Sequence, residues 1–516
     1  MDNLSEKRKE ILSRFKNVTL SHKNLKMRDD IRKALPHLKK AMDSMHEIFL
    51  LQQDEELAER IKQVQKQDDE LGEFYRRFQG PWYPVEEYKS YDPDVADRDP
   101  RCAFYPKDMT KEEYFEAASR LSDEKKEEFE SPASLIRREG GELKAVPYHQ
   151  AYAEYLSGVF DELEAAADAV EHEELSEFLK LRAESLVTGG YRDADAAWVQ
   201  LKDTPLELVL GPYEVYADAL LGRKATYESF LMLVDQEKCD TLAELEGNLD
   251  NLAAAFPLPE GSKPAMGTMA PMIVVHQIYA AGEATQPIFA AAFNLPNDPW
   301  VRGKVGWKQI MLYNVMEQKF DTCTAPIGSK VLAPAASVEF DPYFYFVLLH
   351  EVSHGLGPAY RSDGKNVDNS LGAHYTPIEE AKADSGGLYL LLELGGKFGI
   401  PKFPIETVLG SYVAGLFRSM RFGIKEAHGA ANVIEHNWLL DKGVIERTGE
   451  GYKVHPEKAK DGVKSLLDGI CELQAKGTEK DAELFLDKWA QPDEELLNTT
   501  GSLSDIPVDI FIDYDL

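Results

Sequence analysis

The sequence has few cysteines and no long apolar run, and both absences limit where the chain can work. Its four cysteines, Cys102, Cys239, Cys323 and Cys471, lie far apart and form no CxxC pair, as expected of reduced thiols rather than of a disulfide framework. No run of about 18 apolar residues occurs, so we expect no membrane-spanning helix and no membrane partner. The start, MDNLSEKRKEILSRF, lacks the apolar segment of a signal peptide. A cytoplasmic protein is therefore expected.

Basic residues are also scarce. The chain carries 58 Lys and Arg against 90 Asp and Glu, a formal net charge of -32. Nucleic-acid binding needs clustered positive charge, and no stripe of basic and aromatic residues is present, so we expect no nucleic-acid partner. The acidic balance can simply keep the protein in solution, but it also suits a cationic partner such as the amino end of a peptide. The GxxxxGK[ST], GxSxG and post-strand GxGxxG motifs are absent, which argues against the nucleotide-binding and serine-hydrolase sites built on them.

The apolar pattern indicates a mainly α protein with a minority of β. Spacings of three and four predict helices over residues 1–80, from Lys111 to about Ala253, and again over the last hundred residues. The stretch from Gly80 to Pro106, rich in Pro, Tyr and Asp, predicts loop and short strand. Further strands are predicted at Met272 to Ala280 and at Lys330 to Phe340. A length of 516 residues favours two or three cooperating units.

The strongest chemical signal is the segment His350-Glu351-Val352-Ser353-His354. Residues four apart share one face of a helix, so both imidazoles can bind one metal ion. Glu351 then lies beside the ion, where it can take a proton from a metal-bound water. Asp341 as N-cap and Pro342 at the first helical position predict where this helix begins. The alternative is a chance HExxH on a surface helix.

A catalytic zinc ion usually has three protein ligands, and the third is expected on a second helix. Downstream, Thr376 and Glu379 form a capping-box pattern. One alternative for Glu379 is therefore a purely structural role as a helix cap. Glu380 has no such local role and is the predicted metal ligand. Asp384 and Glu379 can orient the histidines from outside the ligand set. The alternative for Asp384 is a solvated charge on the helix.

At these residues the sequence resembles the dipeptidyl peptidase III family of zinc exopeptidases. The resemblance is carried by HEVSHG at 350–355, EEAKAD at 379–384 and GLYLLL at 387–392. Shorter matches extend it over about 211–437. They are Glu214 and Tyr216 in a Glu-x-Tyr segment, Glu228 in TYESF, Asn294 and Asn297 in an Asn-x-Pro-Asn segment, and His428 after Ala427.

The resemblance implies roles for these residues. Tyr216 and His428 would stabilise the transition state, and donors of these types suit an oxyanion. Glu214 and Glu228 would attract the substrate ammonium group, while Asn294 and Asn297 would hold its main chain. Each has an ordinary alternative: packing for the tyrosine, a hydrogen-bonded helix histidine, or a plain Asn-Pro turn. His436 is expected to be structural.

Much of the family carries an extra residue before the second histidine, whereas this chain has the five-residue spacing of shorter members. The segment between His354 and Glu380 is also shorter than in the longer members, which implies a trimmed cleft rim. These departures concern rate and substrate preference rather than metal binding.

The resemblance implies two lobes around a wide central cleft. We expect about residues 1–325 to form a discontinuous lobe of helices with a small β-structure, and about residues 326–516 to form a mostly helical zinc-binding lobe. The expected function is a zinc-dependent dipeptidyl peptidase, an aminopeptidase-like hydrolase of oligopeptides with one Zn²⁺. The ligand set His₂Glu also accepts cobalt or manganese. The alternatives are a hydrolase of non-peptide amides and a non-catalytic protein that holds peptides or partners in the cleft. No feature of the sequence indicates an oligomeric state.

Overall fold

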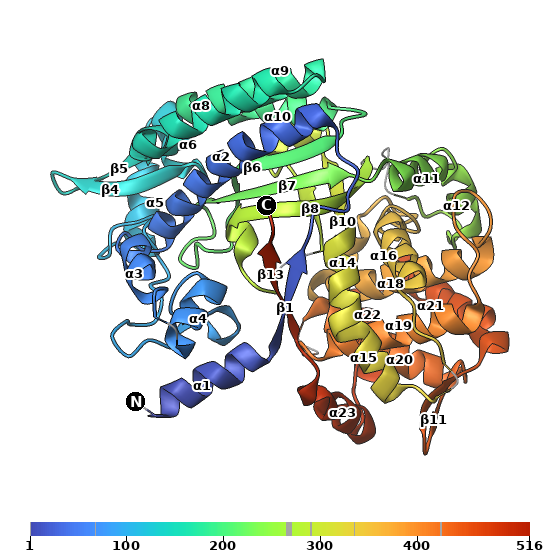
Figure 1. Ribbon diagram of the computed structural model, residues 1–516. Coiled ribbons are helices and arrows are strands. Elements are labelled where there is room, and N and C mark those ends of the chain that lie inside the picture. Colours follow the sequence, from blue (N-terminus) through green and yellow to red (C-terminus); the bar gives the residue numbers. More distant parts are fainter. Residues whose placement is uncertain (1, 68, 265–270, 289–290, 335, 424–425) are drawn as a thin grey trace. The chain divides into compact units, whose positions relative to one another are not determined.

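The computed structural model describes residues 2–67, 69–264, 271–288, 291–334, 336–423 and 426–516. Helices hold most of these residues and strands a minority (Figure 1), which confirms the predicted class. None of the described helices has the length and apolarity needed to cross a bilayer.

The chain divides into two compact units. Unit 1 comprises Met1–Gln236, Ala270–Val315 and Ile510–Leu516, and unit 2 comprises Glu237–Met269 and Met316–Asp509. The sequence-based boundary at 325 lies close to the crossing after Val315. Compared with a boundary at 325, the segments 237–269 and 316–325 lie in unit 2 and the segment 510–516 lies in unit 1. The wide cleft implied by the family resemblance stays a prediction.

Unit 1 combines helices with most of the strands. Its helices are α1 (Asp2–Ser13), α2 (Asp29–Gln53), α3 (Leu57–Val64), α4 (Glu70–Phe78), α5 (Lys111–Ser119), α6 (Asp123–Glu130), α7 (Tyr148–Ala151), α8 (Ala153–Ala169), α9 (Glu173–Thr188), α10 (Tyr191–Gln200) and α13 (Pro299–Lys304). Its strands are β1 (Phe15–Leu20), β2 (Trp82–Tyr83), β3 (Lys89–Ser90), β4 (Ser134–Glu139), β5 (Glu142–Pro147), β6 (Leu206–Glu214), β7 (Thr226–Val234), β8 (Met272–Gly282), β9 (Ala292–Leu295), β10 (Lys308–Leu312) and, from Ile510 on, β13 (Asp509–Tyr514).

A five-stranded sheet organises unit 1. Its strand order is β6-β7-β8-β10-β9, and every pair is antiparallel except β8 with β10. β7 reads as the nearly continuous apolar run TYESFLMLV and is buried along almost its whole length, as a strand covered on both faces should be. Strand β8 confirms the predicted strand from Met272. β1 pairs with β13, so segments from the two ends of the chain lie side by side in unit 1 (Figure 1).

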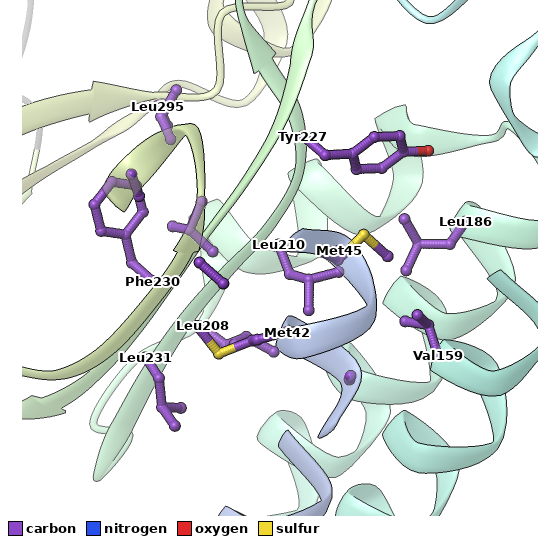
Figure 2. Close-up of a cluster of buried hydrophobic side chains, with 14 of the residues drawn as sticks. Met42, Met45, Val159, Leu186, Leu208, Leu210, Tyr227, Phe230, Leu231 and Leu295 are labelled. Atoms are coloured by element: carbon purple, nitrogen blue, oxygen red, sulfur yellow. The ribbon is translucent and has the colours of Figure 1, made fainter. Parts of the chain in front are cut away.

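The largest core of unit 1 lies between this sheet and the helices α2, α8 and α9, which cover one of its faces (Figure 1). Figure 2 shows Met42 and Met45 of α2 among side chains of the sheet, such as Leu210, and of the helices, such as Val159 and Leu186. All five side chains are fully buried. Burying an apolar side chain of this size contributes about 1.5–3 kcal/mol, so this core fixes the sheet whose strand ends carry the functional carboxylates described below.

Unit 2 is mostly helical. Its helices are α11 (Gln236–Glu246), α12 (Leu249–Ala255), α14 (Tyr313–Lys319), which begins in unit 1, α15 (Ala325–Val331), α16 (Phe340–His354), α17 (Val367–Leu371), α18 (Tyr375–Leu394), α19 (Ile405–Met420), α20 (Ala427–Asp441), α21 (Pro456–Lys476), α22 (Glu479–Trp489) and α23 (Glu494–Gly501). Its hairpin consists of β11 (Ile445–Thr448) and β12 (Gly451–Val454). Helix α18 packs against α16, α20 and α21 and is buried along most of its length.

One of the local predictions is wrong and another is incomplete. The strand predicted over Lys330 to Phe340 is absent from the described part of that segment, since α15 continues to Val331 and α16 begins at Phe340, while residue 335 lies outside the described residues. The mainly helical prediction for 111–253 is confirmed by the helices α5 to α12, but it did not include the four strands β4 to β7. Both differences arise because short apolar runs fit a buried strand and a buried helix equally well.

Candidate metal centre

Two adjacent helices of unit 2 carry the predicted metal ligands. His350 and His354 lie on α16, and Glu380 lies on α18. The two helices approach closely because α18 contains Gly386 and Gly387. A Cβ atom at Gly387 would lie 2.6 Å from the backbone nitrogen of His350, and one at Gly386 would lie 2.9 Å from the Ser353 hydroxyl. The paired glycines therefore let the carboxylate-bearing helix lie directly against the histidine-bearing helix.

Three donor atoms of these residues converge. The Nε2 atoms of His350 and His354 are 3.2 Å apart, and Glu380 Oε2 lies 3.5 Å from the first and 3.7 Å from the second. Ligand atoms about 2.05 Å from a tetrahedral zinc ion are about 3.3 Å from one another. Glu380 Oε2 is also buried and has no hydrogen-bond partner among the described residues, which is costly for a carboxylate oxygen. This donor set therefore fits a divalent metal ion.

The second nitrogen of each histidine is bound by a carboxylate. His350 Nδ1 lies 2.6 Å from Asp384 Oδ1, and His354 Nδ1 lies 3.0 Å from Glu379 Oε1. Glu379 also accepts hydrogen bonds from Lys382 and Gln474, each at 2.8 Å. A carboxylate on Nδ1 fixes the tautomer that leaves Nε2 free for a metal, as is usual for metal-binding histidines.

The pKa values of this cluster follow from the same contacts. Burial opposes ionisation of Glu379, but the Lys382 ammonium and His354 outweigh it and lower the pKa of Glu379 to about 2. Burial also disfavours a charged His350, yet Asp384, Glu351 and Glu380 raise the pKa of His350 to about 9. In the metal-free protein a proton therefore competes with a metal ion for His350, and metal binding releases that proton.

The other predicted catalytic residues of unit 2 flank these donors. Glu351 is partly exposed on α16, between the two histidines. His428 stands near the start of α20 with a side chain that is 63% exposed, and its Nε2 lies 3.3 Å from Glu380 Oε2. His350, Glu380 and His428 also form a cluster whose donor atoms lie within 4.8 Å of one another. Among the residues that the structure describes, no carboxylate binds the second nitrogen of His428.

In unit 1 the structure brings two of the predicted substrate-binding residues together. Asn297 Nδ2 donates to Glu214 Oε1 at 3.0 Å and to the carbonyl of Tyr213 at 3.3 Å. Glu214 ends β6, and both residues line a pocket of about 1060 Å³ within unit 1. Asn294 lies exposed on β9, opposite Gln309 of β10. Tyr216 follows β6 and is 75% exposed.

Glu228 belongs to a group of carboxylates at neighbouring positions of the sheet. Glu214 pairs with Thr226 across β6 and β7, and Glu228 follows on the same face of β7, paired with Gly282 of β8. The next residue, Glu283, accepts a hydrogen bond from Thr226. Glu228 is buried, and burial together with Glu283 and Glu214 raises its pKa well above the usual range. Burial, with Glu214 adding to it, raises the pKa of Glu283 to about 7.

Sequence reasoning missed Glu283 in unit 1 and Asn432 and Glu435 in unit 2. Each meets its partners only through strand register or helix packing, so no local spacing signals it. Asn432 Nδ2 donates to Asp384 Oδ2 at 2.9 Å, and Glu435 is fully buried behind it.

Both predicted helix caps are wrong. Helix α16 begins at Phe340 with Glu339 as its N-cap, so Asp341 and Pro342 lie inside the first turn. Helix α18 begins at Tyr375, and no capping box forms at Thr376. Because Glu379 binds His354, Lys382 and Gln474 instead, its carboxylate serves the histidine rather than the helix end.

The chain was compared with known families and structures. Residues 106–360 match the model of peptidase family M49. The solved structure of DPP III from Caldithrix abyssi is 34% identical, with a TM-score of 0.91 over 98% of this chain and 99% of that chain. This protein belongs to the dipeptidyl peptidase III family. Dipeptidyl-peptidase III from Corallococcus sp. strain EGB is also similar, with 31% identity and a TM-score of 0.78 over 99% of this chain and 97% of that chain.

Curated relatives of this family member are longer than the chain. Nudix hydrolase 3 of Arabidopsis thaliana is 31% identical over 441 residues, which are 80% of this chain and 57% of that protein. Dipeptidyl peptidase 3 of Nematostella vectensis is 26% identical over 315 residues, 54% of this chain and 41% of that protein. The chain thus spans about half the length of the curated relatives it matches. Metal binding and peptide hydrolysis by this chain are therefore proposed below rather than taken from its relatives.

Proposed function

We propose that this protein is a zinc-dependent dipeptidyl peptidase that removes dipeptides from the free amino end of oligopeptides. The observation that carries the proposal is the convergence of His350 Nε2, His354 Nε2 and Glu380 Oε2 at separations of 3.2 to 3.7 Å. Such a set offers three ligands to zinc and leaves a coordination position open, as hydrolytic zinc sites do.

His350, His354 and Glu380 are the proposed ligands, with Asp384 and Glu379 orienting the two rings. His428 offers another nitrogen near Glu380. We assign it a different role because both ligand histidines have Nδ1 held by a carboxylate, and ring orientation of this kind accompanies metal ligation. Zinc is the proposed metal, although cobalt and manganese suit the same donors.

When bound, the metal ion acts as a Lewis acid and makes water a nucleophile at neutral pH. Glu351 then serves as the general base that accepts the proton of the attacking water, since it follows His350 directly on α16 and remains accessible. As the peptide bond breaks, the same carboxyl returns a proton to the leaving amine. Tyr216 and His428, both exposed at more than half of their side-chain surface, are the proposed donors to the oxyanion.

The amino end of the substrate is the part that unit 1 is proposed to bind. Glu214 supplies negative charge for an ammonium group and the buried Glu228 supplies carboxyl oxygens that can accept its hydrogen bonds. Asn297, held to Glu214 at 3.0 Å, aligns the main chain together with Asn294. Burial strengthens a charge-assisted hydrogen bond because fewer water molecules compete for it. A blocked amino end would leave these carboxylates unpaired, so peptides with an unblocked amino end are the expected substrates. The expected setting is the cytoplasm.

The test is a comparison of wild type with Glu351→Gln, both purified, loaded with zinc and assayed on an unblocked oligopeptide. Glutamine keeps the shape of the side chain but cannot accept a proton. We expect equal zinc content and a fall in turnover of about 10²–10⁴-fold. A variant with unchanged turnover would remove Glu351 from the mechanism. Zinc-loaded wild type that binds peptides tightly without cleaving them would favour a non-catalytic peptide-binding protein instead.

A further inference from the structure

A buried carboxyl group of unit 2 has no role in the steps above. Glu435 lies on α20 with no exposed surface. Its Oε2 atom accepts hydrogen bonds from the Tyr412 hydroxyl at 2.6 Å and from Asn432 Nδ2 at 3.3 Å. Its Oε1 atom is buried and has no hydrogen-bond partner among the described residues. Neither of these two donors carries a positive charge.

Asn432 links Glu435 to the residues around the metal ligands. The same Nδ2 atom that contacts Glu435 also donates to Asp384 Oδ2 at 2.9 Å. Asp384 in turn holds His350 Nδ1 at 2.6 Å. The chain of contacts therefore runs from Tyr412 on α19, through Glu435 and Asn432 on α20, to Asp384 on α18, and ends at a proposed metal ligand.

We propose that Glu435 is a neutral carboxylic acid. Its protonated Oε1 donates a hydrogen bond to the Asp384 carboxylate and so positions His350 for the metal ion. An ionised Glu435 would be a buried charge without a cation and beside a second carboxylate, which is strongly unfavourable. Because Oε2 already accepts two hydrogen bonds, the proton belongs on Oε1, the oxygen otherwise left without a partner.

The titratable groups that face Glu435 agree with this assignment. They are Asp384 from α18 and Tyr412 from α19. Burial, with the charge of Asp384 adding to it, raises the pKa of the Glu435 carboxyl well above its usual range. Asp384 remains the only carboxylate of the pair that must be ionised, and it then accepts from His350, Asn432 and Glu435. These three hydrogen bonds hold the Asp384 carboxylate in one orientation, and the carboxylate in turn holds the His350 ring in the orientation that a metal ion needs.

Glu435 is thus a positioning residue, and the inference rests on the proposed metal site. It predicts that the protein needs the neutral, hydrogen-bonding form of this side chain rather than its charge. The variants Glu435→Gln and Glu435→Met separate these properties. Glutamine keeps the shape and a donor for Asp384, whereas methionine fills a similar volume without a donor. Glu450→Gln, at an exposed carboxylate of the β11–β12 turn, is the matched control.

The first readout is the infrared difference spectrum between wild type and Glu435→Gln at pH 7, recorded without metal. A protonated-carboxyl band that is present in wild type and lost in the variant is expected, and the difference for Glu450→Gln should contain no such band. Loss of a carboxylate band in Glu435→Gln would overturn the proposal. This readout needs neither zinc nor peptidase activity, so it can fail independently of the proposed function.

The second readout is zinc affinity, measured by competition with a chromogenic chelator. Glu435→Gln should bind zinc within about threefold of wild type, whereas Glu435→Met should bind it about 10–100-fold more weakly. Thermal unfolding of the metal-free variants shows whether each is folded. If Glu435→Met does not fold, the infrared result and the affinity of Glu435→Gln decide. Tight zinc binding by a folded Glu435→Met, or a large loss in Glu435→Gln, would contradict the positioning role.

Discussion

The Nε2 atoms of His350 and His354 face each other at 3.2 Å, while the Nδ1 atom of each ring is held by a carboxylate. In the metal-free protein one of these nitrogens carries the proton that it shares with the other in a hydrogen bond, and a bound metal ion would take the place of that proton. A metal ion between them and Glu380 would satisfy all three donors at once. On the proposed function, metal binding would therefore stabilise unit 2 as well as support catalysis.

Removal of the metal should destabilise the protein. An ion that binds only the folded state adds about 4 kcal/mol to the free energy of unfolding when its concentration is a thousand times its Kd. Treating the zinc-loaded protein with a chelator is therefore expected to lower Tm by several degrees, and adding zinc back should restore it. Differential scanning calorimetry measures this shift.

His354→Ala tests whether the stabilisation comes from the proposed ligands. In this variant Glu379 keeps its contacts with Lys382 and Gln474, so we expect a folded protein whose Tm no longer responds to zinc or chelator. The control is His374→Ala, which changes a histidine between α17 and α18 that the proposal does not use. A zinc response that persists in His354→Ala at full size would contradict the ligand assignment.

Glu214→Gln should weaken binding of peptides with a free amino end. A hydrogen bond to a charged group contributes about 1.5–3 kcal/mol, so replacing the carboxylate by an amide is expected to raise KM about 10–100-fold, with a smaller change in kcat. Steady-state kinetics on an unblocked tetrapeptide measures both constants.

Glu127→Gln is the matched control, because Glu127 is an exposed carboxylate lining the same pocket of unit 1. Its KM should equal that of wild type. Equal effects of the two substitutions would indicate a general loss of negative charge rather than a specific contact with the ammonium group.

Glu283→Gln should stabilise the protein at alkaline pH. Burial raises the pKa of Glu283 to about 7 in the folded state, against about 4.5 in the unfolded chain. Between these values the folded state holds a proton that the unfolded state has lost, so the free energy of unfolding falls as pH rises through this window. Above pH 7 the loss is on the order of 3 kcal/mol, and the glutamine variant avoids it.

Urea unfolding of wild type and Glu283→Gln at pH 4.5 and at pH 8 measures this difference. The two proteins should have similar unfolding free energies at the lower pH, and the variant should be the more stable one at pH 8. A stability difference of equal size at both pH values would show that the hydrogen bond with Thr226, rather than ionisation, decides the effect.

Local spacing predicted that His350 and His354 come together, because the HExxH pattern places two histidines on one helical face without any knowledge of the tertiary fold. The structure puts His350, His354 and Glu380 together. His436, for which a structural role was predicted, lies in a buried contact with the Tyr452 hydroxyl at 3.1 Å. Helix boundaries were less predictable. Asp341 looked like an N-cap, but the N-cap of α16 is Glu339, two residues earlier.

Contacts between distant elements could not be predicted from spacing. Glu283 meets Thr226 only because β7 and β8 pair in one register, and Glu435 meets Asn432 and Tyr412 only because α19 and α20 pack together. The strands β6 and β7 were hidden for a related reason. Their apolar runs, such as LELVLG from Leu206, carry no alternation that separates strand from helix.

The most direct test of the proposed function is a mass-spectrometric digest of oligopeptides by the zinc-loaded protein. Each peptide is supplied in two forms, with a free and with an acetylated amino end, and Glu351→Gln serves as the blank. We expect dipeptides to be released only from the peptides with a free amino end. Equal cleavage of the acetylated forms, or release of single amino acids, would contradict the claim that the carboxylates of unit 1 bind the substrate ammonium group and set a dipeptide product.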